Sequence, residues 1–363
     1  DRAAAQAFCD RIDAALAEPY LLMDGPARVT ASVGLSLTAG DTTVTGLLAD
    51  ADLAMYEAKA ERRGEPISRD PLRRRTANER RQLADDLALG LQRGEIVAHL
   101  QPIVSLADGT TTAVEALARW NHPRLGVLGP LAFLALAEDA GLDLLLGDAV
   151  LRSACEAVAA LPQPIGLGIN LSVAQLADRD LRDRIALILQ QAGVPPQQLT
   201  VEITERDTLT RRAGGGCVAP ERTLFELHQL GASLALDDFG TGYSSLTHIR
   251  RFPLRTLKID RAFVAGAADH AEDRAVIAAM VGMAGALGLS VVGEGVERFD
   301  QFDMLRTLGC DMAQGFLIST PLTADELQHW MQHHGRDFRT AVGSVTPAGD
   351  SRGTGRARRT RGV

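Results

Sequence analysis

Short apolar runs alternate with amphipathic stretches from about residue 83 to residue 335. Eight runs are candidate strands: IVAHLQPIVSL (96–106), TTAVEALARW (111–120), IGLGINLS (165–172), LTVEITE (199–205), SLALDDFG (233–240), TLKID (256–260), SVVGEGVE (290–297) and MAQGFLIS (312–319). Helical patterns, such as those over 220–231 and 272–288, separate most of them. Repeated strand–helix units predict an α/β fold with a parallel sheet and helices outside it. About eight strands in about 250 residues fit a closed (β/α)8 barrel, with a doubly wound open sheet as the alternative.

Three further regions differ in pattern. Residues 1–64 predict an amphipathic helix over 2–16, a strand over 28–37 and a strand-to-helix turn within 43–64, with the helix ending at Gly64. Residues 65–82 are charged and rich in arginine, which is typical of a linker that enters a helix. Residues 336–363 hold seven arginines and little apolar content, which predicts a disordered basic tail.

Composition narrows the function classes. The 363 residues carry a net charge of −8, which argues against a general nucleic-acid binder. Four widely spaced cysteines predict free thiols in a reducing compartment, hence the cytoplasm. No apolar run reaches the roughly 20 residues that span a bilayer, so no membrane segment is expected, although a longer parent protein with an anchor stays open.

A polar residue follows or ends nearly every apolar run. The set is Glu115, Asn170, Glu202, Asp237 with Asp238, Lys258, Glu294 and Gln314. Successive members lie 55, 32, 35, 21, 36 and 20 residues apart, and most of these steps match one strand–helix unit. Because the carboxyl ends of barrel strands converge on one face, we expect these side chains to meet in one pocket.

The chemistry of this set is coherent. Carboxylates and an amide oxygen are hard ligands suited to Mg²⁺ or Mn²⁺, and so many carboxylates repel each other unless cations lie among them. Adjacent aspartates at a strand end can bridge two metals, and a lysine suits phosphoryl charge or a bound water. The pattern therefore favours metal-assisted phosphoester chemistry on an undefined substrate.

Simpler interpretations exist for single members. A lone strand-end aspartate is usually a helix cap or a turn residue, and the Asp237–Asp238 pair alone is evenly balanced between capping and metal binding. Lys258 could form a salt bridge with Asp260. The segment DDFGTGYSSL (237–246) lacks the spacing of a P-loop, no G-x-S-x-G element is present, and the scattered histidines make zinc a poor expectation.

Seven motifs now resemble one family. They are EALARW (115–120), NLS (170–172), EITE (202–205), DDFGTGYSSL (237–246), KID (258–260), EGVE (294–297) and QGF (314–316). In order and spacing they resemble the EAL-domain family of cyclic di-GMP phosphodiesterases, over about residues 83–335. The resemblance implies a TIM-like (β/α)8 barrel with one antiparallel strand, a homodimer through the EAL domain, and hydrolysis of cyclic di-GMP to linear pGpG with two Mg²⁺ or Mn²⁺ ions per site.

The resemblance also implies residue roles. Metal ligands would be Glu115, Asn170, Glu202, Asp237 and Asp238, with Asp237 bridging the two metals. Lys258 would orient the attacking water and offset phosphate charge, and Glu294 would be a ligand or general base. The nucleotide would be held by Gln101, Arg119, Glu297 and Gln314. Glu205 would anchor the loop 239–246.

Two further expectations come from resemblance. Residues 1–64 resemble the C-terminal half of a GGDEF, or diguanylate cyclase, domain, whose signature would precede Asp1. This partial α+β fragment should not be a cyclase by itself.

Alternatives to an active phosphodiesterase are a catalytically silent cyclic di-GMP receptor or scaffold, and a two-metal phosphodiesterase for another nucleotide. All predicted ligands are present, which favours the active enzyme.

Overall fold

The structure, a computed structural model, describes Arg11, Tyr20–Leu22, Gly25–Ala27 and residues 77–204, 220–240 and 252–333. The chain divides into two units, Asp1–Arg81 and Gln82–Val363. In the first unit, β1 (Tyr20–Leu22) and β2 (Gly25–Ala27) form an antiparallel pair. Apart from the helical Arg11, the elements predicted within 1–64 lie outside the described residues, as do most of the linker and the basic tail. The GGDEF resemblance therefore stays a prediction.

Eight strands of the second unit close into a barrel. They are β3 (Ile96–Ser105), β4 (Thr111–His122), β6 (Gly166–Asn170), β7 (Leu199–Thr204), β8 (Ser233–Phe239), β9 (Leu254–Ile259), β10 (Ser290–Gly293) and β11 (Met312–Gln314). From β4 through β6 to β11, each strand pairs in parallel with the next. β3 closes the ring by pairing antiparallel with both β11 and β4.

One short strand lies outside this ring. β5 (Gly126–Leu128) pairs antiparallel with the end of β4. The closed ring confirms the TIM-like α/β barrel with one antiparallel strand, and it excludes the open doubly wound sheet. The sequence pattern did not predict β5.

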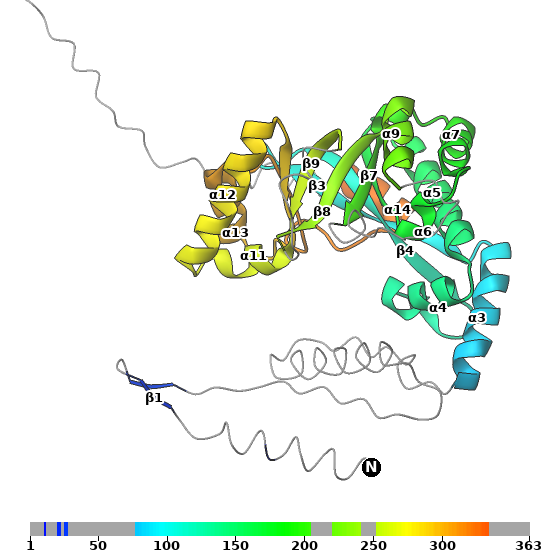
Figure 1. Cartoon of the computed structure of the whole chain (residues 1–363), viewed down its shortest axis with the longest axis horizontal. Helices are drawn as coiled ribbons and strands as arrows, with labels where there is room; N and C mark the ends of the chain where they lie inside the picture. Colours follow the sequence, from blue (N-terminus) through cyan, green and yellow to red (C-terminus); the bar gives the residue numbers. More distant parts are fainter. Residues whose placement is uncertain are drawn as a thin grey trace, which may run out of the picture. The chain divides into compact units, whose positions relative to one another are not determined.

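Helices surround the barrel strands (Figure 1). They are α3 (Ala77–Gln92), α4 (Leu134–Asp139), α5 (Asp143–Ala159), α6 (Val173–Leu176), α7 (Leu181–Ala192), α9 (Pro220–Leu230), α11 (Arg261–Ala267), α12 (Ala271–Leu287), α13 (Phe299–Leu308) and α14 (Ala324–Gln332), with short 3-10 turns η2 (Pro130–Ala132) and η3 (Pro196–Gln198). In Figure 1, α11, α12 and α13 lie on one side of the strands, and α5, α7 and α9 lie on the other. Among the described residues, no helix combines the length and apolar character that a bilayer crossing requires.

The burial pattern explains why these segments form this architecture. On β8, the consecutive residues Leu234, Ala235 and Leu236 are all buried, because one face of the strand packs inside the barrel and the other packs under helices. α9 is amphipathic, with Leu224 and Leu227 buried on the face toward the sheet. This arrangement leaves the carboxyl ends of the parallel strands free to carry polar side chains.

Candidate active site

Lys258 occupies the centre of the barrel's carboxyl end. β9 directs it inward, and the residue is 1% exposed. Its Nζ lies 2.5 Å from Glu202 Oε2, 2.7 Å from Glu294 Oε1, 3.1 Å from Glu115 Oε2 and 3.4 Å from Asp237 Oδ1. One ammonium group is therefore surrounded by four carboxylates. Three of them lie on strands β4, β7 and β8, and the fourth, Glu294, directly follows β10.

Amide side chains orient Glu115 within this group. Asn170 Nδ2 donates to Glu115 Oε1 at 2.7 Å, and Gln314 Nε2 donates to Glu115 Oε2 at 2.8 Å. The register explains this convergence, because Glu115 pairs with Gln101 on β3 and with Gly168 on β6, two residues before Asn170. Both oxygens of Glu115 thus have fixed hydrogen-bond donors.

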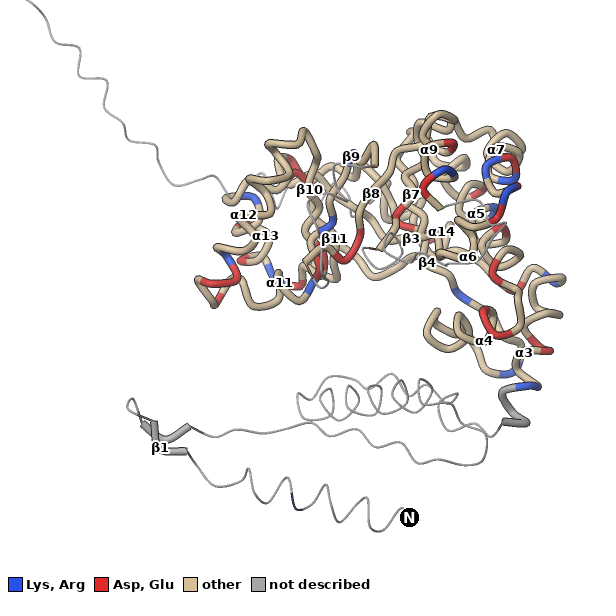
Figure 2. Tube along the Cα trace, viewed as in Figure 1, with Lys and Arg blue, Asp and Glu red and all other residues tan. Residues whose placement is uncertain are grey.

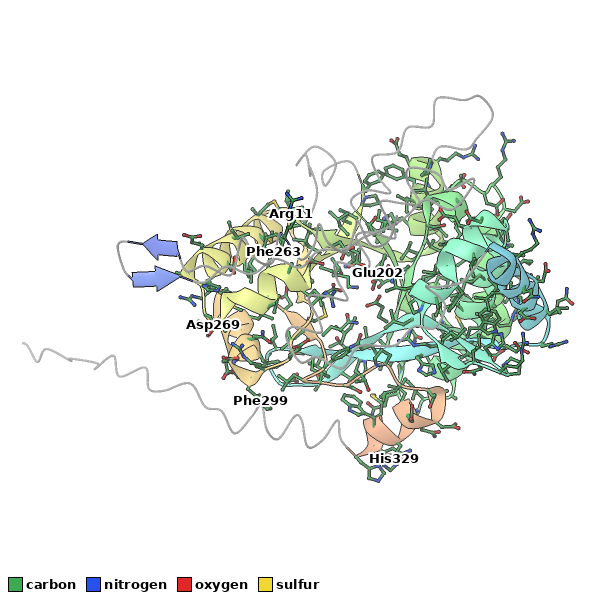
Figure 3. The ribbon with its side chains drawn as sticks, turned by 90° about the horizontal axis from the view of Figure 1, so that it is seen from below. Arg11, Glu202, Phe263, Asp269, Phe299 and His329 are labelled. Atoms are coloured by element: carbon green, nitrogen blue, oxygen red, sulfur yellow. The ribbon has the colours of Figure 1, made fainter. Side chains whose placement is uncertain are left out.

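Gly168 makes room for Glu202. Glu202 is 2% exposed, and its side chain crosses toward the neighbouring strand β6. A Cβ atom at position 168 would overlap Glu202 Oε1, so any larger residue would push the carboxylate away from Lys258. Figure 3 labels Glu202 among the strands.

The aspartate pair depends on an irregularity of the sheet. Adjacent residues of a regular strand point to opposite faces, which would separate Asp237 from Asp238. The pairing of β8 with β9 shifts register between Leu236 and Phe239, and Asp238 adopts a φ of 54°. With this local distortion, carboxylate oxygens of Asp237, Asp238 and Glu294 all lie within 4.8 Å of one another.

We call this group of side chains the ionic cluster. Its members are Glu115, Glu202, Asp237, Asp238, Lys258 and Glu294. Figure 2 shows acidic and basic positions close together near the labels of β8 and β11. The structure therefore brings together the residues that the sequence predicted at separate strand ends.

Burial and mutual charge shift the pKa values inside the ionic cluster. Burial alone would lower the pKa of Lys258, but Glu115, Glu202, Glu294 and Asp237 raise it well above its usual value. Burial raises the pKa of Glu202 well above normal, against the opposing charge of Lys258. Burial would also raise the pKa of Glu115, yet Lys258 and the amide hydrogen bonds lower it. The lysine is therefore charged, and together with the amide donors it stabilises the charge on Glu115.

Two carboxyl groups nearer the surface hold protons unusually well. Burial raises the pKa of Glu294 to about 8, with Asp237 and Glu115 adding to the shift and Lys258 opposing it. Burial, the charge of Asp237 and a hydrogen bond with Asp260 raise the pKa of Asp238 to about 6. Without bound cations, Asp238 and Glu294 thus keep their protons to a higher pH than ordinary carboxyl groups do.

The donor set fits divalent cations. Five carboxylates and one ammonium group give the fully ionised cluster a formal charge of −5 + 1 = −4. Asp237 Oδ1 is buried without a hydrogen-bond partner among the described residues. Hard oxygen ligands with this excess negative charge suit Mg²⁺ or Mn²⁺, while soft metals would require thiolates or imidazoles.

The other predicted residues occupy different environments. Gln101 and Gln314 are buried and engaged with protein atoms, since Gln314 Nε2 donates to Gln101 Oε1 and Gln101 Nε2 donates to Ser319 O, both at 3.0 Å. Arg119 is half-buried and donates to Ala118 O at 2.8 Å, and Glu297 is exposed beside α13. Glu205 lies outside the described residues, as does the loop 239–246 beyond Gly240.

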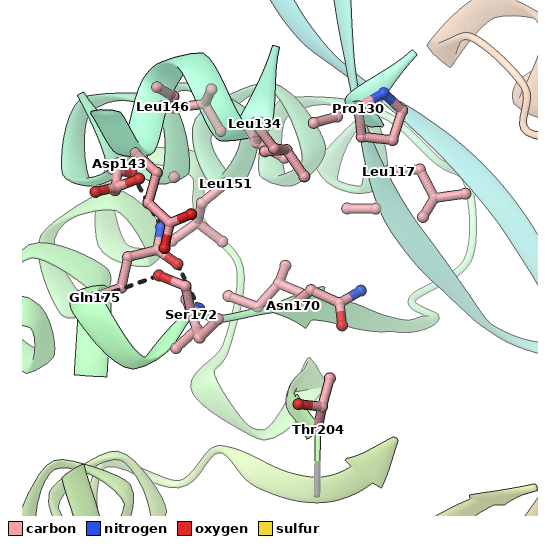
Figure 4. Close-up of a pocket in the computed structure, with 18 residues that line it drawn as sticks. Leu117, Pro130, Leu134, Asp143, Leu146, Leu151, Asn170, Ser172, Gln175 and Thr204 are labelled. Atoms are coloured by element: carbon pink, nitrogen blue, oxygen red, sulfur yellow. Dashed lines mark hydrogen bonds between the residues drawn. The ribbon is translucent and has the colours of Figure 1, made fainter. Parts of the chain in front are cut away.

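An apolar cavity of about 410 Å³ lies beside the ionic cluster, and the sequence did not predict it (Figure 4). Its walls include Leu117 on β4, Leu134 on α4, and Leu146 and Leu151 on α5. Polar residues also line it: Glu138, Asp143, Asn170, Ser172, Gln175 and Thr204. Because Asn170 also donates to Glu115, the apolar cavity and the ionic cluster share a wall.

Two more residues near the cluster were not assigned from sequence. Asp260 caps α11 by accepting from Ala262 N at 2.7 Å, and its carboxyl group also contacts that of Asp238. Phe316 follows β11 and is 64% exposed, unusual for a large aromatic side chain. Both lie in the KID and QGF motifs, so the signal was present in the sequence.

Comparison with known proteins identifies relatives of this arrangement. The family described as EAL domain matches residues 81–321. The chain is 36% identical over 328 residues to the bifunctional diguanylate cyclase/cyclic di-GMP phosphodiesterase MucR of Pseudomonas aeruginosa, covering 89% of this chain and 47% of MucR. It is 39% identical over 251 residues to the cyclic di-GMP phosphodiesterase RocR of the same species, covering 68% of this chain and 62% of RocR.

A solved structure agrees with these matches. The PaMucR phosphodiesterase in complex with c-di-GMP superposes with a TM-score of 0.62 at 38% identity, covering 68% of this chain and 99% of that one. The chain spans 47% and 62% of the lengths of MucR and RocR, so it corresponds to part of each.

Proposed function

The chain belongs to the EAL domain family, and from that premise we propose that it hydrolyses cyclic di-GMP to linear pGpG with Mg²⁺ or Mn²⁺. The observation that carries this proposal is a buried lysine surrounded by carboxylates, directly beside an apolar cavity. The names of MucR and RocR as cyclic di-GMP phosphodiesterases support it.

Two divalent cations would balance the charge of the ionic cluster, because +4 offsets −4. One cation would be held by Glu115, Asn170, Glu202 and Asp237, and the second by Asp237, Asp238 and Glu294. Asn170 uses its amide nitrogen for Glu115, which leaves its amide oxygen available for a cation. The chemistry that bound cations supply is polarisation of the phosphodiester and a lower pKa for a nearby water.

The chain's own residues then place the reacting groups. Lys258 presents a permanent positive charge where the phosphoryl oxygens gain negative charge, and it contacts Glu294 at 2.7 Å. Glu294 lies 2.7 Å from Lys258 Nζ, where it would either hold a cation or accept a proton from the attacking water as general base. Arg119 on the same strand as Glu115 provides a second cation for the phosphates.

The apolar cavity would receive one guanine base. Flat aromatic ligands bind in cavities with apolar walls and a few convergent polar groups, and Leu117, Leu146 and Ser172 provide both kinds of surface. Its shared wall with Glu115 puts a bound nucleotide within reach of the ionic cluster. The exposed ring of Phe316 offers a stacking surface for the second base.

We also propose a homodimer through the EAL domain. From Ala275 to Leu287, α12 carries no charged residue, yet Val276 is 39% and Leu287 is 40% exposed. A second copy could cover this apolar face. Light scattering should find a dimer for the wild type, a monomer for Val276→Glu, and no change for Leu187→Glu, an equally apolar and 52% exposed position on α7. A monomeric wild type would contradict the proposal.

A turnover assay tests the enzymatic proposal. Purified protein is incubated with cyclic di-GMP and Mg²⁺ or Mn²⁺, and pGpG is measured by chromatography. Wild type should form pGpG, and Glu115→Ala should form none while keeping its circular dichroism spectrum. Binding without turnover in the wild type would instead support a receptor. Turnover of only a different dinucleotide would show that cyclic di-GMP is not the substrate.

The cytoplasmic location stays a prediction, with which the buried thiols Cys155 and Cys310 agree.

A further inference from the structure

A second, smaller cavity lies on the barrel axis beneath the ionic cluster. Its volume is about 90 Å³, and interior residues of all eight barrel strands line it. Glu202 and Lys258 form its boundary toward the active site, and Thr200 and Thr256 lie one inward-facing position earlier on the same two strands, β7 and β9. The axial cavity, as we call it, is therefore continuous with the underside of the catalytic residues.

Small side chains create this space. The interior of a (β/α)8 barrel is normally filled by layers of bulky branched residues. Here Ala113, Gly168 and Ala235 occupy three of the interior positions around the axial cavity. Gly168 is required so that Glu202 can fit, and the two alanines enlarge the space beyond that requirement.

Three polar groups at this cavity, one carboxylate oxygen and two hydroxyl groups, have no hydrogen-bond partners in the described part of the chain. Glu202 is 2% exposed, and its Oε2 contacts Lys258 while its Oε1 receives no donor there. Thr200 and Thr256 are half-buried, and their hydroxyl groups have no hydrogen-bond partner among the described residues. A buried carboxylate oxygen without a donor is costly, and ordered water is the usual solution where a cavity is polar and large enough.

The size of the axial cavity permits this solution. About 10–15 Å³ is enough to admit one water molecule, so about 90 Å³ admits several. A carboxylate oxygen and two hydroxyl groups supply the two to four partners that a buried water needs. A metal cation is a poor occupant, because the ammonium group of Lys258 lines the same space.

We propose that the axial cavity holds a cluster of ordered water molecules that hydrogen-bonds Glu202 Oε1 to the hydroxyl groups of Thr200 and Thr256. The waters fix the Glu202 carboxylate from below, while Lys258 holds it from the side. Thr200 and Thr256 are thus positioning residues that act through water. The effect on cation binding rests on the proposed function, but the presence of water does not.

Isosteric substitutions distinguish a water-filled cavity from an empty one by the direction in which they change the Tm. Thr256→Val and Thr200→Val keep the volume and remove one hydroxyl each. If water is bound, each variant loses a hydrogen bond and its Tm falls by about 2–5 °C. If the cavity is dry, removal of an unsatisfied hydroxyl leaves the Tm unchanged or raises it. Thr111→Val on β4, outside the axial cavity, is the matched control for the strand preference of valine.

Two measurements complete the test. A high-resolution crystal structure should contain at least one water within hydrogen-bond distance of Glu202 Oε1, and a cavity without density would overturn the proposal, as would an unchanged or raised Tm. Titration calorimetry with Mn²⁺ should give roughly tenfold weaker binding for Thr256→Val than for Thr111→Val. The Tm and the crystallographic water can both be measured in protein that shows no turnover. Failure of the proposed function and failure of this inference are therefore separate results.

Discussion

The ionic cluster and the apolar cavity share Asn170 as a wall, yet they are built in opposite ways. The cluster takes its charged side chains from strand ends around the barrel, and all of them meet near Lys258. The cavity is lined by leucines from β4, α4 and α5, and Lys258 does not line it. With cations bound in the cluster, a ligand that fills both would combine negative charge with an apolar ring system.

This difference divides the work of the site. In the proposed function, the charged, buried cluster would act on phosphate and supply little discrimination among bases, while the apolar cavity would contribute binding without chemistry. Substitutions in the first region should therefore reduce kcat, and substitutions in the second should raise KM. The variants below are chosen to separate these two effects.

The largest effect is expected for Lys258→Met. Removal of the only ammonium group in the ionic cluster should lower kcat by about 1,000-fold, because phosphoryl charge in the transition state loses its partner. The uncompensated carboxylates should also lower the free energy of unfolding by about 3–5 kcal/mol in EDTA. Steady-state kinetics and thermal melts measure the two effects. Mn²⁺ should recover much of the lost Tm but not the turnover; recovery of turnover by Mn²⁺ would remove Lys258 from the mechanism.

Narrowing the apolar cavity should act on binding alone. Leu134→Trp adds bulk at the cavity wall and should raise KM for cyclic di-GMP by about 10–100-fold, since a base can no longer enter fully. The kcat at saturation should change by less than about threefold. Leu131→Trp is the matched control, because Leu131 is 80% exposed on η2 and does not line the cavity. Equal KM values for the two variants would place the base elsewhere.

Gly168→Ala tests the geometry that supports the ionic cluster. The added methyl group overlaps Glu202 Oε1 and should displace this carboxylate, weakening Mn²⁺ binding about tenfold. Titration calorimetry measures the change. Gly166→Ala on the same strand is a control, because its new Cβ would meet Ala113 Cβ at 3.0 Å and Thr112 O at 3.5 Å and no member of the ionic cluster. If Gly168→Ala binds Mn²⁺ like the wild type, Glu202 is not a ligand.

The ionic cluster also makes stability depend on pH, without bearing on turnover. Asp238 and Glu294 have pKa values of about 6 and about 8, above their usual values, so the folded protein binds these protons more tightly than the unfolded chain. By linkage, stability is greatest below the unfolded pKa values and falls as the pH rises through 6 and 8. Thermal melts in EDTA should show Tm decreasing from pH 5 to pH 9.

Divalent cations should reverse that trend. Mn²⁺ competes with these protons, so the rise in Tm that it causes should grow with pH. Glu294→Gln should flatten the upper part of the decrease in EDTA. A Tm that is constant or increasing between pH 6 and pH 9 in EDTA would contradict the electrostatic description of the ionic cluster.

The sequence predicts the ionic cluster better than the apolar cavity, for a physical reason. Glu115, Glu202 and Lys258 end apolar runs at intervals of one or two strand–helix units, and barrel closure alone brings such positions together. Cavity residues such as Leu134 and Leu146 look like ordinary helix positions, and only the packing of α4 and α5 leaves space between them. No periodicity encodes that space.

Irregular backbone geometry is the second feature that the sequence does not predict. The sequence places Asp237 beside Asp238, but only the register shift and the left-handed φ of Asp238 bring both carboxylates to one face. The strands predicted over 290–297 and 312–319 are shorter in the structure, because the chain leaves the sheet after Gly293 and Gln314. There Gly315 lies against the backbone of Val296, a contact between two loops that sequence patterns do not reveal.

Anomalous diffraction from crystals of the Lys258→Met variant with Mn²⁺ and cyclic di-GMP tests both regions at once. This variant keeps every proposed cation ligand, and its slow turnover should retain the substrate. The account predicts two Mn²⁺ peaks in the ionic cluster, with Asp237 between them, and one guanine inside the apolar cavity. Absence of Mn²⁺ from the cluster, or a nucleotide bound with both bases outside the cavity, would contradict it.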